Sequence, residues 1–413
     1  MTGNSEPKIA AKPKYRVSPT FLIVMTLFID AIGFGIIVPL LPFYTASFHF
    51  GSASLGFLVA SFAIMQFFFS PILGRISDRV GRKPVLVISI LVSTISYVIF
   101  GFADSYLLLL LSRIIAGIAT ENAVAQAYIA DITTEKTRAS GIGKVTAANG
   151  AGFIIGPAIG GFLSVYGFWA PGFAAALLTL TNLLFVLFFL PETNRNRSLN
   201  RTVNSNPENT SNHNILDALK KPVIGSVLVI HFLVFLAFSA IPVILPLLGI
   251  EYFALGATDM SYIFIYIGTV QIILQSFIIG RLANKFGEAT LIVIGPLLMI
   301  TGISLMPMIP HILVFLASIT MIASGSGIMR TIVPTFLSRL TPTDEQGGIL
   351  GIAGSMISIA TVPGPLIGGF LFELAGPIVA FLGSAAILAV GLIFSFRVIR
   401  KYKKSNGTAP KAT

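Results

Sequence analysis

The sequence has no cysteine, a single tryptophan and few charged residues, which make up only 10% of its 413 positions. Without cysteine the chain has no disulfide, no thiolate–metal site and no thiol nucleophile. A soluble protein carries roughly 25% charged residues. Since 55% of this chain is hydrophobic, it cannot cover its surface with polar side chains in water. The composition excludes a soluble enzyme and predicts an integral membrane protein.

Apolar runs that are long enough to cross a bilayer recur along the chain. They lie near residues 20–43, 55–76, 84–103, 107–130, 141–165, 170–190, 222–249, 260–282, 289–308, 311–338, 346–372 and 376–397. Each run is expected to be a helix, because an open strand would leave its backbone groups unpaired in lipid. The predicted fold is an all-α integral membrane protein with twelve transmembrane helices.

The net charge of +11 comes from 27 Lys and Arg residues against 16 Asp and Glu residues. Of these cations, 25 lie in the two tails, the central linker and alternate loops, and the remaining two are inside spans. The loops on the opposite side hold no Lys or Arg. Positively charged loops stay in the cytoplasm, so both termini and the linker are predicted to be cytoplasmic, in a plasma or inner membrane. The excess charge therefore indicates membrane topology and not nucleic-acid binding.

The two halves of the chain repeat each other at an offset of about 207 residues. Segments 36–42, 74–81 and 156–161 match 243–249, 280–287 and 364–369 in the same order. Each half has six spans, which predicts two parallel bundles related by an axis along the membrane normal. The predicted domains are an N-terminal tail (1–19), a first six-helix bundle (20–190), a linker (191–221), a second six-helix bundle (222–397) and a C-terminal tail (398–413).

Several motifs resemble those of the major facilitator superfamily. Segment 74–83 resembles the signature of that family between spans 2 and 3. Segment 113–117 is similar to a span-4 motif of its drug/proton antiporters, and 152–161 resembles an antiporter motif that importers usually lack. Segments 30–42 and 127–131 resemble bacterial tetracycline-efflux proteins. The resemblance covers all twelve spans and implies a proton-coupled drug antiporter. One chain contains both bundles, so a monomer is expected.

Ionisable side chains inside membrane spans are costly and are functional candidates by default. They fall in spans 1, 4, 7 and 10, the equivalent first helices of each three-helix unit, which are expected to surround one cavity. The residues predicted for proton coupling and the substrate cavity are Asp30, Arg113, Glu121, His231 and Arg330, with Gln126, Asn149 and Gln271 as further polar contacts.

Each ionisable residue has a functional and a structural interpretation. Because burial disfavours the charged form of a carboxyl group, Asp30 is predicted either to exchange a proton or to be held by local hydrogen bonds. Arg113 is always charged, and it either takes part in a proton relay or clamps helix-end carbonyls. Glu121 and Arg330 either pair across the two-fold axis or pair within their own bundles. His231 either titrates near neutral pH or stays neutral and hydrogen-bonded.

Segment 74–83 predicts a cytoplasmic gate. Asp78 is expected near a helix N-terminus, and Arg79 or Arg82 is expected to reach Asp131 at the end of span 4. In the alternative interpretation the cations of this loop only set topology. Asn284 replaces the acid in the second half, so the gate should be asymmetric. The gate residues are Gly74, Asp78, Arg79, Gly81, Arg82 and Asp131.

Gly152, Gly156 and Gly160 recur at every fourth position of span 5, around Pro157. Small residues at this spacing predict close helix packing, with a hinge or a seal at the bundle interface as the functional alternative.

These patterns predict a secondary transporter that exports small amphipathic or cationic drug-like compounds in exchange for protons, by alternating access. The alternatives are a proton symporter that imports a small metabolite or sugar, and a non-transporting membrane sensor of the same fold. The expected partners are protons, the small-molecule substrate and the bilayer. No cofactor, metal or enzymatic activity is expected, because the phosphate-binding loop of an ATP-driven pump and the clustered histidines of a metalloenzyme are both missing from the sequence.

Overall fold

The computed structural model describes residues 18–193, 215–342 and 345–406, and nearly all of these residues are helical. Within these ranges the chain forms no strand. Most of the predicted N-terminal tail, the middle of the predicted linker and the last residues of the predicted C-terminal tail lie outside the described residues.

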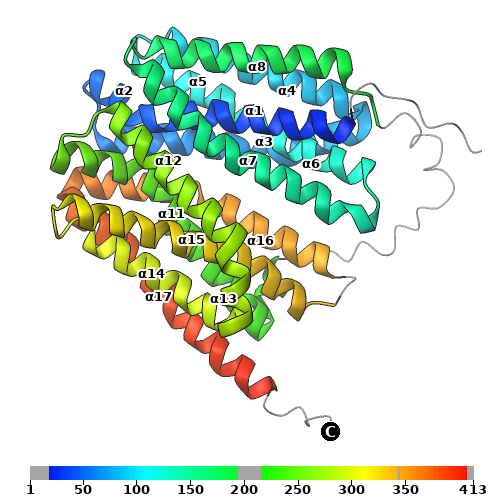
Figure 1. Ribbon diagram of the computed structural model, residues 1–413, viewed down its shortest axis with the longest axis vertical. Coiled ribbons are helices and arrows are strands. Elements are labelled where there is room, and N and C mark those ends of the chain that lie inside the picture. Colours follow the sequence, from blue (N-terminus) through cyan, green and yellow to red (C-terminus); the bar gives the residue numbers. More distant parts are fainter. Residues whose placement is uncertain (1–17, 194–214, 343–344, 407–413) are drawn as a thin grey trace, which may run out of the picture.

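Helices follow one another in both halves of the chain (Figure 1). The first half contains α1 (Pro19–Ile37), η1 (Val38–Leu40), α2 (Leu41–Ser47), α3 (Ser52–Val80), α4 (Arg82–Gly101), α5 (Tyr106–Ile118), α6 (Glu121–Ile132), α7 (Glu135–Ser164) and α8 (Trp169–Phe189). The second half contains α10 (Ile215–Lys220), α11 (Pro222–Phe253), α12 (Ala257–Ile273), the π-helical η4 (Leu274–Ile278), α13 (Ile279–Phe286), α14 (Glu288–Leu305), α15 (Ile312–Leu340), α16 (Gln346–Ala360) and α17 (Pro363–Asn406).

Eleven helical stretches of the described chain are long and apolar enough to cross a membrane. The last of them, Gln346–Val398, is 53 residues long and contains two crossings. They are separated at Gly376, whose φ of 77° lies in the left-handed region that glycine tolerates best. With this break the predicted twelve spans are present, and the all-α membrane fold is confirmed.

The structure differs from the predicted spans in two of the inner helices. The first span continues through η1 and α2 to Ser47, because Pro39 and Pro42 bend the helical path without ending it. The fourth span is not continuous: α5 ends at Ile118 and α6 begins at Glu121. Hydropathy does not reveal this break, because the mean hydropathy within the stretch Tyr106–Ile132 remains high enough for a single span.

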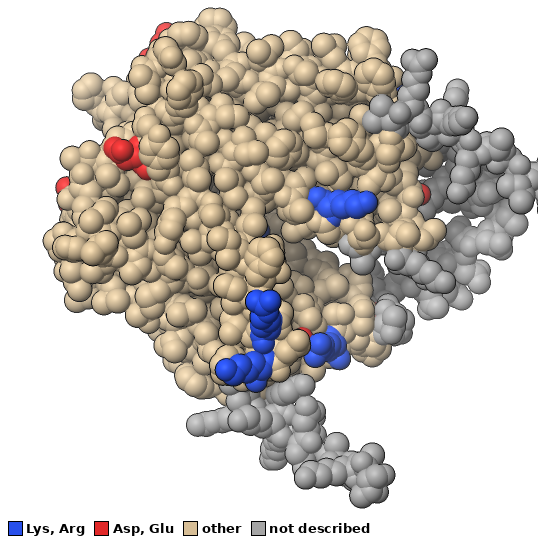
Figure 2. Space-filling model, in the orientation of Figure 1, with Lys and Arg blue, Asp and Glu red and all other residues tan. Residues whose placement is uncertain are grey.

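The first half of the chain forms the upper part of the molecule in Figure 1, and the second half forms the lower part. The helices alternate in direction, which brings Arg82, Lys285 and Arg339 to one end, called the basic end here. Glu251, Asp259 and Glu373 lie at the opposite, acidic end. In Figure 2 the visible Lys and Arg side chains likewise gather towards one end, and most of the visible Asp and Glu side chains lie at the other.

The two halves are in close contact at the acidic end. A Cβ atom added to Gly56 on α3 would collide with the carbonyl oxygen of Pro365 on α17. Glu373 extends this contact, since its Oε2 accepts a hydrogen bond of 2.7 Å from the backbone amide of Ala53. On the other flank Thr258 of α12 donates to the carbonyl of Gly161 on α7, over 3.1 Å.

At the basic end the two halves are apart. Figure 2 shows the surface hollowed between them on this side. Six glycines at the basic-end portions of four helices support this, since a Cβ atom added to any of them would meet no atom within 4 Å. They are Gly74, Gly143, Gly280, Gly347, Gly351 and Gly354. The structure is therefore closed at the acidic end and open at the basic end.

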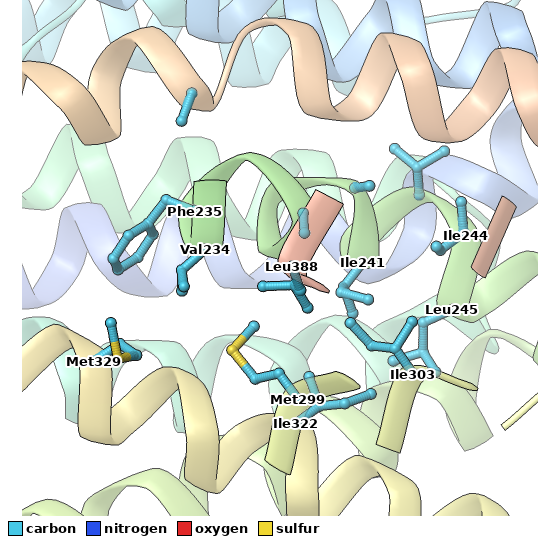
Figure 3. Packing of buried hydrophobic residues seen from close by; sticks show 14 of the residues in the cluster. Val234, Phe235, Ile241, Ile244, Leu245, Met299, Ile303, Ile322, Met329 and Leu388 are labelled. Atoms are coloured by element: carbon cyan, nitrogen blue, oxygen red, sulfur yellow. The ribbon is translucent and has the colours of Figure 1, made fainter. Parts of the chain in front are cut away.

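The interior of the second half is apolar and continuous. Figure 3 shows α11 side chains such as Phe235 and Ile241 directed towards Met329 of α15 and Met299 of α14. All four side chains are buried. This packing holds α15 in a fixed rotation, which decides the direction of its polar residues.

Candidate functional site

Two carboxyl groups lie near each other inside the first half of the chain. Asp30 is half-buried in the middle of α1, and Glu121 is buried in the first turn of α6. The two are close enough to interact electrostatically. Ser93 of α4 donates a hydrogen bond of 2.6 Å to Glu121 Oε1. No ion pair to either carboxyl group occurs in the part of the chain that the structure describes.

Tyr97 connects this acid cluster to the helix that carries Asp30. Its side chain lies within electrostatic range of Asp30, Glu121 and Arg113. A Cβ atom added to Gly33 on α1 would come within 2.8 Å of the Tyr97 hydroxyl oxygen. Glycine at position 33 therefore lets this hydroxyl approach α1 one turn after Asp30.

Arg113 on α5 is almost completely buried, with 2% of its surface exposed. Its guanidinium carbon lies 5.3 Å from the ring centroid of Phe100 on α4. Its Nε donates weakly to Ser112, at 3.5 Å, and Nη2 has no hydrogen-bond partner among the described residues. The Arg113 side chain donates to no helix-end carbonyl among the described residues, so the clamp that was its structural alternative is not seen there.

His231, Phe235 and Arg330 form a small cluster in the second half. The His231 ring lies 4.8 Å from the Phe235 ring, and the Arg330 guanidinium carbon lies 5.3 Å from the same ring. His231 is buried, and neither ring nitrogen has a hydrogen-bond partner among the described residues. The expected hydrogen-bonded histidine is therefore absent. Arg330 is exposed, although it follows the fully buried Met329.

Glu121 and Arg330 are not paired in this conformation. Glu121 accepts from Ser93 within its own half, whereas Arg330 stacks on Phe235. No ion pair joins the two within the described ranges. The physical reason is the separation of the two halves at the basic end, towards which both residues lie.

The three polar residues that the sequence predicted for the cavity have different surroundings. Gln126 is exposed on α6 and donates to Asn122 over 2.9 Å. Gln271 of α12 donates to Ser326 of α15 over 3.2 Å, so it ties two helices of the second half together. Asn149 is half-buried on α7.

Arg82 is the centre of the network that the loop signature predicted. It is buried at the start of α4, and its Nε donates to Asp131 Oδ2 over 3.0 Å. Its two terminal nitrogens donate to Ser77 and Asp78, each over 2.6 Å. Of the two arginines that were predicted to reach Asp131, the structure places Arg82 there and leaves Arg79 exposed. Gly74 faces open space.

Glu192 is a member of this network that the sequence analysis did not identify. Its carboxylate accepts from the backbone amides of Arg82 and Lys83, each over 3.0 Å, so it occupies the N-terminus of α4. Gly81, with a φ of 118°, precedes these amides, and a Cβ atom there would lie 2.7 Å from Glu192 Oε2. A single acid after the sixth span gives no sequence signal, because only the fold brings it to α4.

The glycines of the fifth span face α1 in the same half of the chain. Cβ atoms added to Gly152 and Gly156 would lie 2.6 Å from Ala31 Cβ and from the Ile32 carbonyl oxygen, respectively. Gly160 meets Ile36, and Pro157 lies against Gly35. These residues pack α7 on α1, whereas the contact with the other half uses Gly161.

Comparison with known proteins identifies the family. The model of the Major Facilitator Superfamily matches residues 23–277 and 227–413. The chain belongs to that superfamily. This major facilitator protein is 31% identical over 396 residues to a class H tetracycline resistance protein of Pasteurella multocida, covering 95% of this chain and 97% of the relative. It is 30% identical over 398 residues to multidrug resistance protein 2 of Bacillus subtilis, with coverages of 94% and 97%.

The fold of this major facilitator protein also occurs in solved structures. A bacterial homologue of the human lysosomal transporter Spinster, in an inward-facing and occupied conformation, superposes with a TM-score of 0.75 at 15% identity. The superposition covers 94% of this chain and 98% of that structure. The resemblance that the motifs indicated is confirmed: the protein is a multi-pass membrane transporter of this superfamily and not an enzyme.

Proposed function

We propose that this transporter exports amphipathic drug-like compounds from the cytoplasm in exchange for protons. The observation that carries the proposal is the proximity of Asp30 and Glu121, without a paired cation among the described residues, inside the first half of the chain. Two carboxyl groups within electrostatic range of each other in an apolar surrounding repel one another when both are charged, so the site is suited to take up a proton. The names of the tetracycline and multidrug resistance relatives support this class of substrate.

Alternating access would connect the acid cluster to the two sides of the membrane in turn. Positively charged loops stay in the cytoplasm, so the basic end is proposed to be cytoplasmic and the described conformation inward-open. Protonation of the cluster would change the relative stability of this state and of the opposite one. The network around Arg82 and Asp131 is proposed to be the first-half part of the gate at the basic end, since its contacts are formed while the two halves are apart.

The test is proton movement in liposomes that contain the purified protein in known orientation. A pH gradient is imposed, and a lipophilic cation, a tetracycline or a neutral sugar is added. The proposal predicts that the cation or the tetracycline accelerates gradient loss in the wild type and does not do so in Asp30→Asn or Glu121→Gln. Asp104→Asn and Glu251→Gln are matched controls, because both acids are exposed at the acidic end.

Drug-driven gradient loss that survives in both Asp30→Asn and Glu121→Gln would contradict the assignment of the cluster. Proton movement in the same direction as a sugar would replace antiport with symport.

A further inference from the structure

Arg330 is an exposed cation inside an apolar span of the second half. It lies in the apolar α15, which packs on α11, α12, α14 and α16. The Arg330 side chain is exposed, and its guanidinium group lies over Phe235 at the edge of the core that Met329 joins. Charged side chains within membrane spans face a bundle interior or a water-filled cavity. Figure 2 shows the surface hollowed between the two halves at the basic end.

The equivalent inner helix of the first half supports this direction. On α6 the exposed positions Asn122 and Gln126 form a polar stripe. The internal repeat places Arg330 within one residue of the Asn122 equivalent, at the offset of about 207 residues. Both inner helices therefore present polar side chains to the same central space, neutral ones from the first half and a cation from the second.

Within the described part of the chain, the charge of Arg330 is not balanced by a carboxylate. No ion pair with Arg330 occurs within residues 18–193, 215–342 and 345–406. Its contact is the ring of Phe235, which is itself buried and fixed in the core shown in Figure 3. A guanidinium group cannot lose its proton at physiological pH, so Arg330 presents a permanent cation in a fixed position.

We propose that Arg330 and Phe235 form a binding site for the carboxylate of amphipathic aromatic substrates, so that organic anions and zwitterions are among the compounds that the protein carries. One face of the guanidinium group is covered by Phe235, its edge offers parallel N–H donors to a carboxylate, and its other face can stack on an aromatic ring. The acid cluster with Asp30 and Glu121 would attract the cationic group of a zwitterion. This inference rests on the proposed transport function and specifies the substrate.

The experiment compares two probes with the same ring and opposite charges, pyrenebutyrate and pyrenebutyl-trimethylammonium. Their affinities are measured by fluorescence titration of the purified full-length protein in nanodiscs. The wild type should bind the carboxylate, and Arg330→Gln should weaken that binding about tenfold or more, the size expected for a lost charge-assisted pair. Binding of the ammonium probe should be unchanged or tighter in Arg330→Gln, and Arg330→Lys should retain part of the carboxylate affinity.

Arg397→Gln is the matched control. Arg397 also lies over a phenylalanine, 5.2 Å from the Phe394 ring, but at the basic end of α17 outside the central space. Its removal should leave both affinities unchanged.

Equal affinity of wild type and Arg330→Gln for pyrenebutyrate would overturn the inference, and so would equal losses for both probes. Titration does not depend on transport, so its result is separate from that of the liposome test. If the protein exchanges protons but Arg330→Gln binds pyrenebutyrate as well as the wild type does, only the carboxylate site is contradicted. If the protein binds pyrenebutyrate through Arg330 but exchanges no protons in liposomes, only the proposed antiport is contradicted.

Discussion

Glu288 at the start of α14 and Arg339 at the end of α15 form an ion pair, with 3.2 Å between Glu288 Oε1 and Arg339 Nη2. At the repeat offset of about 207 residues, they correspond to Arg82 and Asp131 of the first half. The same two positions are thus bridged in both halves, with the charges exchanged between the helices. The two loops differ in a second way, since Asn284 stands at the position of Asp78. The exchanged charges and this replacement together make the two loops asymmetric.

The exchange of charges changes how each ion pair interacts with the dipoles of the helices that carry it. Glu288 in a first turn and Arg339 in a last turn are both favoured by the helix dipole. Arg82 occupies the first turn of α4, where a cation is disfavoured. Glu192 compensates by placing a carboxylate on the amides of Arg82 and Lys83.

The two pairs should therefore differ in their contribution to stability. Arg82 is buried, so Asp131→Asn is expected to lower the free energy of unfolding by roughly 1–3 kcal/mol. Arg339 has 73% of its side chain exposed, so Glu288→Gln should cost less than about 1 kcal/mol. Thermal unfolding of the purified variants in one detergent measures both effects. A larger loss of stability in Glu288→Gln than in Asp131→Asn would show that burial of the arginine does not decide which pair contributes more.

Glu192 and Gly81 should be energetically coupled. Glu192→Ala removes the acceptor at the start of α4, which is expected to cost about 1 kcal/mol. Gly81→Ala adds a Cβ atom 2.7 Å from Glu192 Oε2 at a residue with a φ of 118°. In the double variant the collision is absent and only the backbone strain remains, so the combined loss should be smaller than the sum. Additive losses in this double-mutant cycle would show that Glu192 does not meet Gly81.

Glu373 should stabilise closure at the acidic end, because it binds the Ala53 amide across the two halves. Loss of one capping interaction of about 1 kcal/mol corresponds to about a fivefold change in the population ratio of the two conformations. Glu373→Ala, which removes the acceptor, is therefore expected to increase the fraction open at the acidic end. Spin labels on Phe102→Cys and Met308→Cys report the distance, and no native cysteine competes for the label.

The matched control for this measurement is Glu251→Ala, at an exposed acid of α11 at the same end. If the label distances in Glu373→Ala match those in this control, Glu373 does not contribute to closure.

A large side chain at Gly351 should trap the conformation described here. A Cβ atom at this position of α16 meets nothing within 4 Å, so Gly351→Leu is expected to fold normally. Closure at the basic end would bring α16 towards the first half, and the added side chain would oppose it. Labels on Lys144→Cys and Lys285→Cys should then stay far apart when substrate is added, and turnover should be lost.

Gly56→Leu provides the opposite case. Its side chain would collide with Pro365 at the acidic end and favour the other conformation. Normal turnover in Gly351→Leu would show that α16 does not approach the first half during transport.

The sequence was sufficient for the membrane fold and its internal repeat. Apolar runs indicate burial in lipid directly, and the distribution of Lys and Arg between the loops predicts on which side of the membrane each loop lies. The loop signature also predicted that an arginine near the start of α4 would meet an acid at the end of α6, since both positions lie at the basic end of the first half. The choice of Arg82 over Arg79 required the rotation of α4, which depends on packing.

Only the tertiary structure decided which buried charges come together. Asp30 and Glu121 are neighbours because α1 and α6 pack in the same half, and Arg330 meets Phe235 and not Glu121 because the halves are apart at the basic end. The roles of Glu192 and Glu373 likewise depend on contacts with helices far away in the sequence. Hydropathy and motifs describe single segments, whereas these pairs depend on the rotation and separation of helices, which are set by packing of the whole chain.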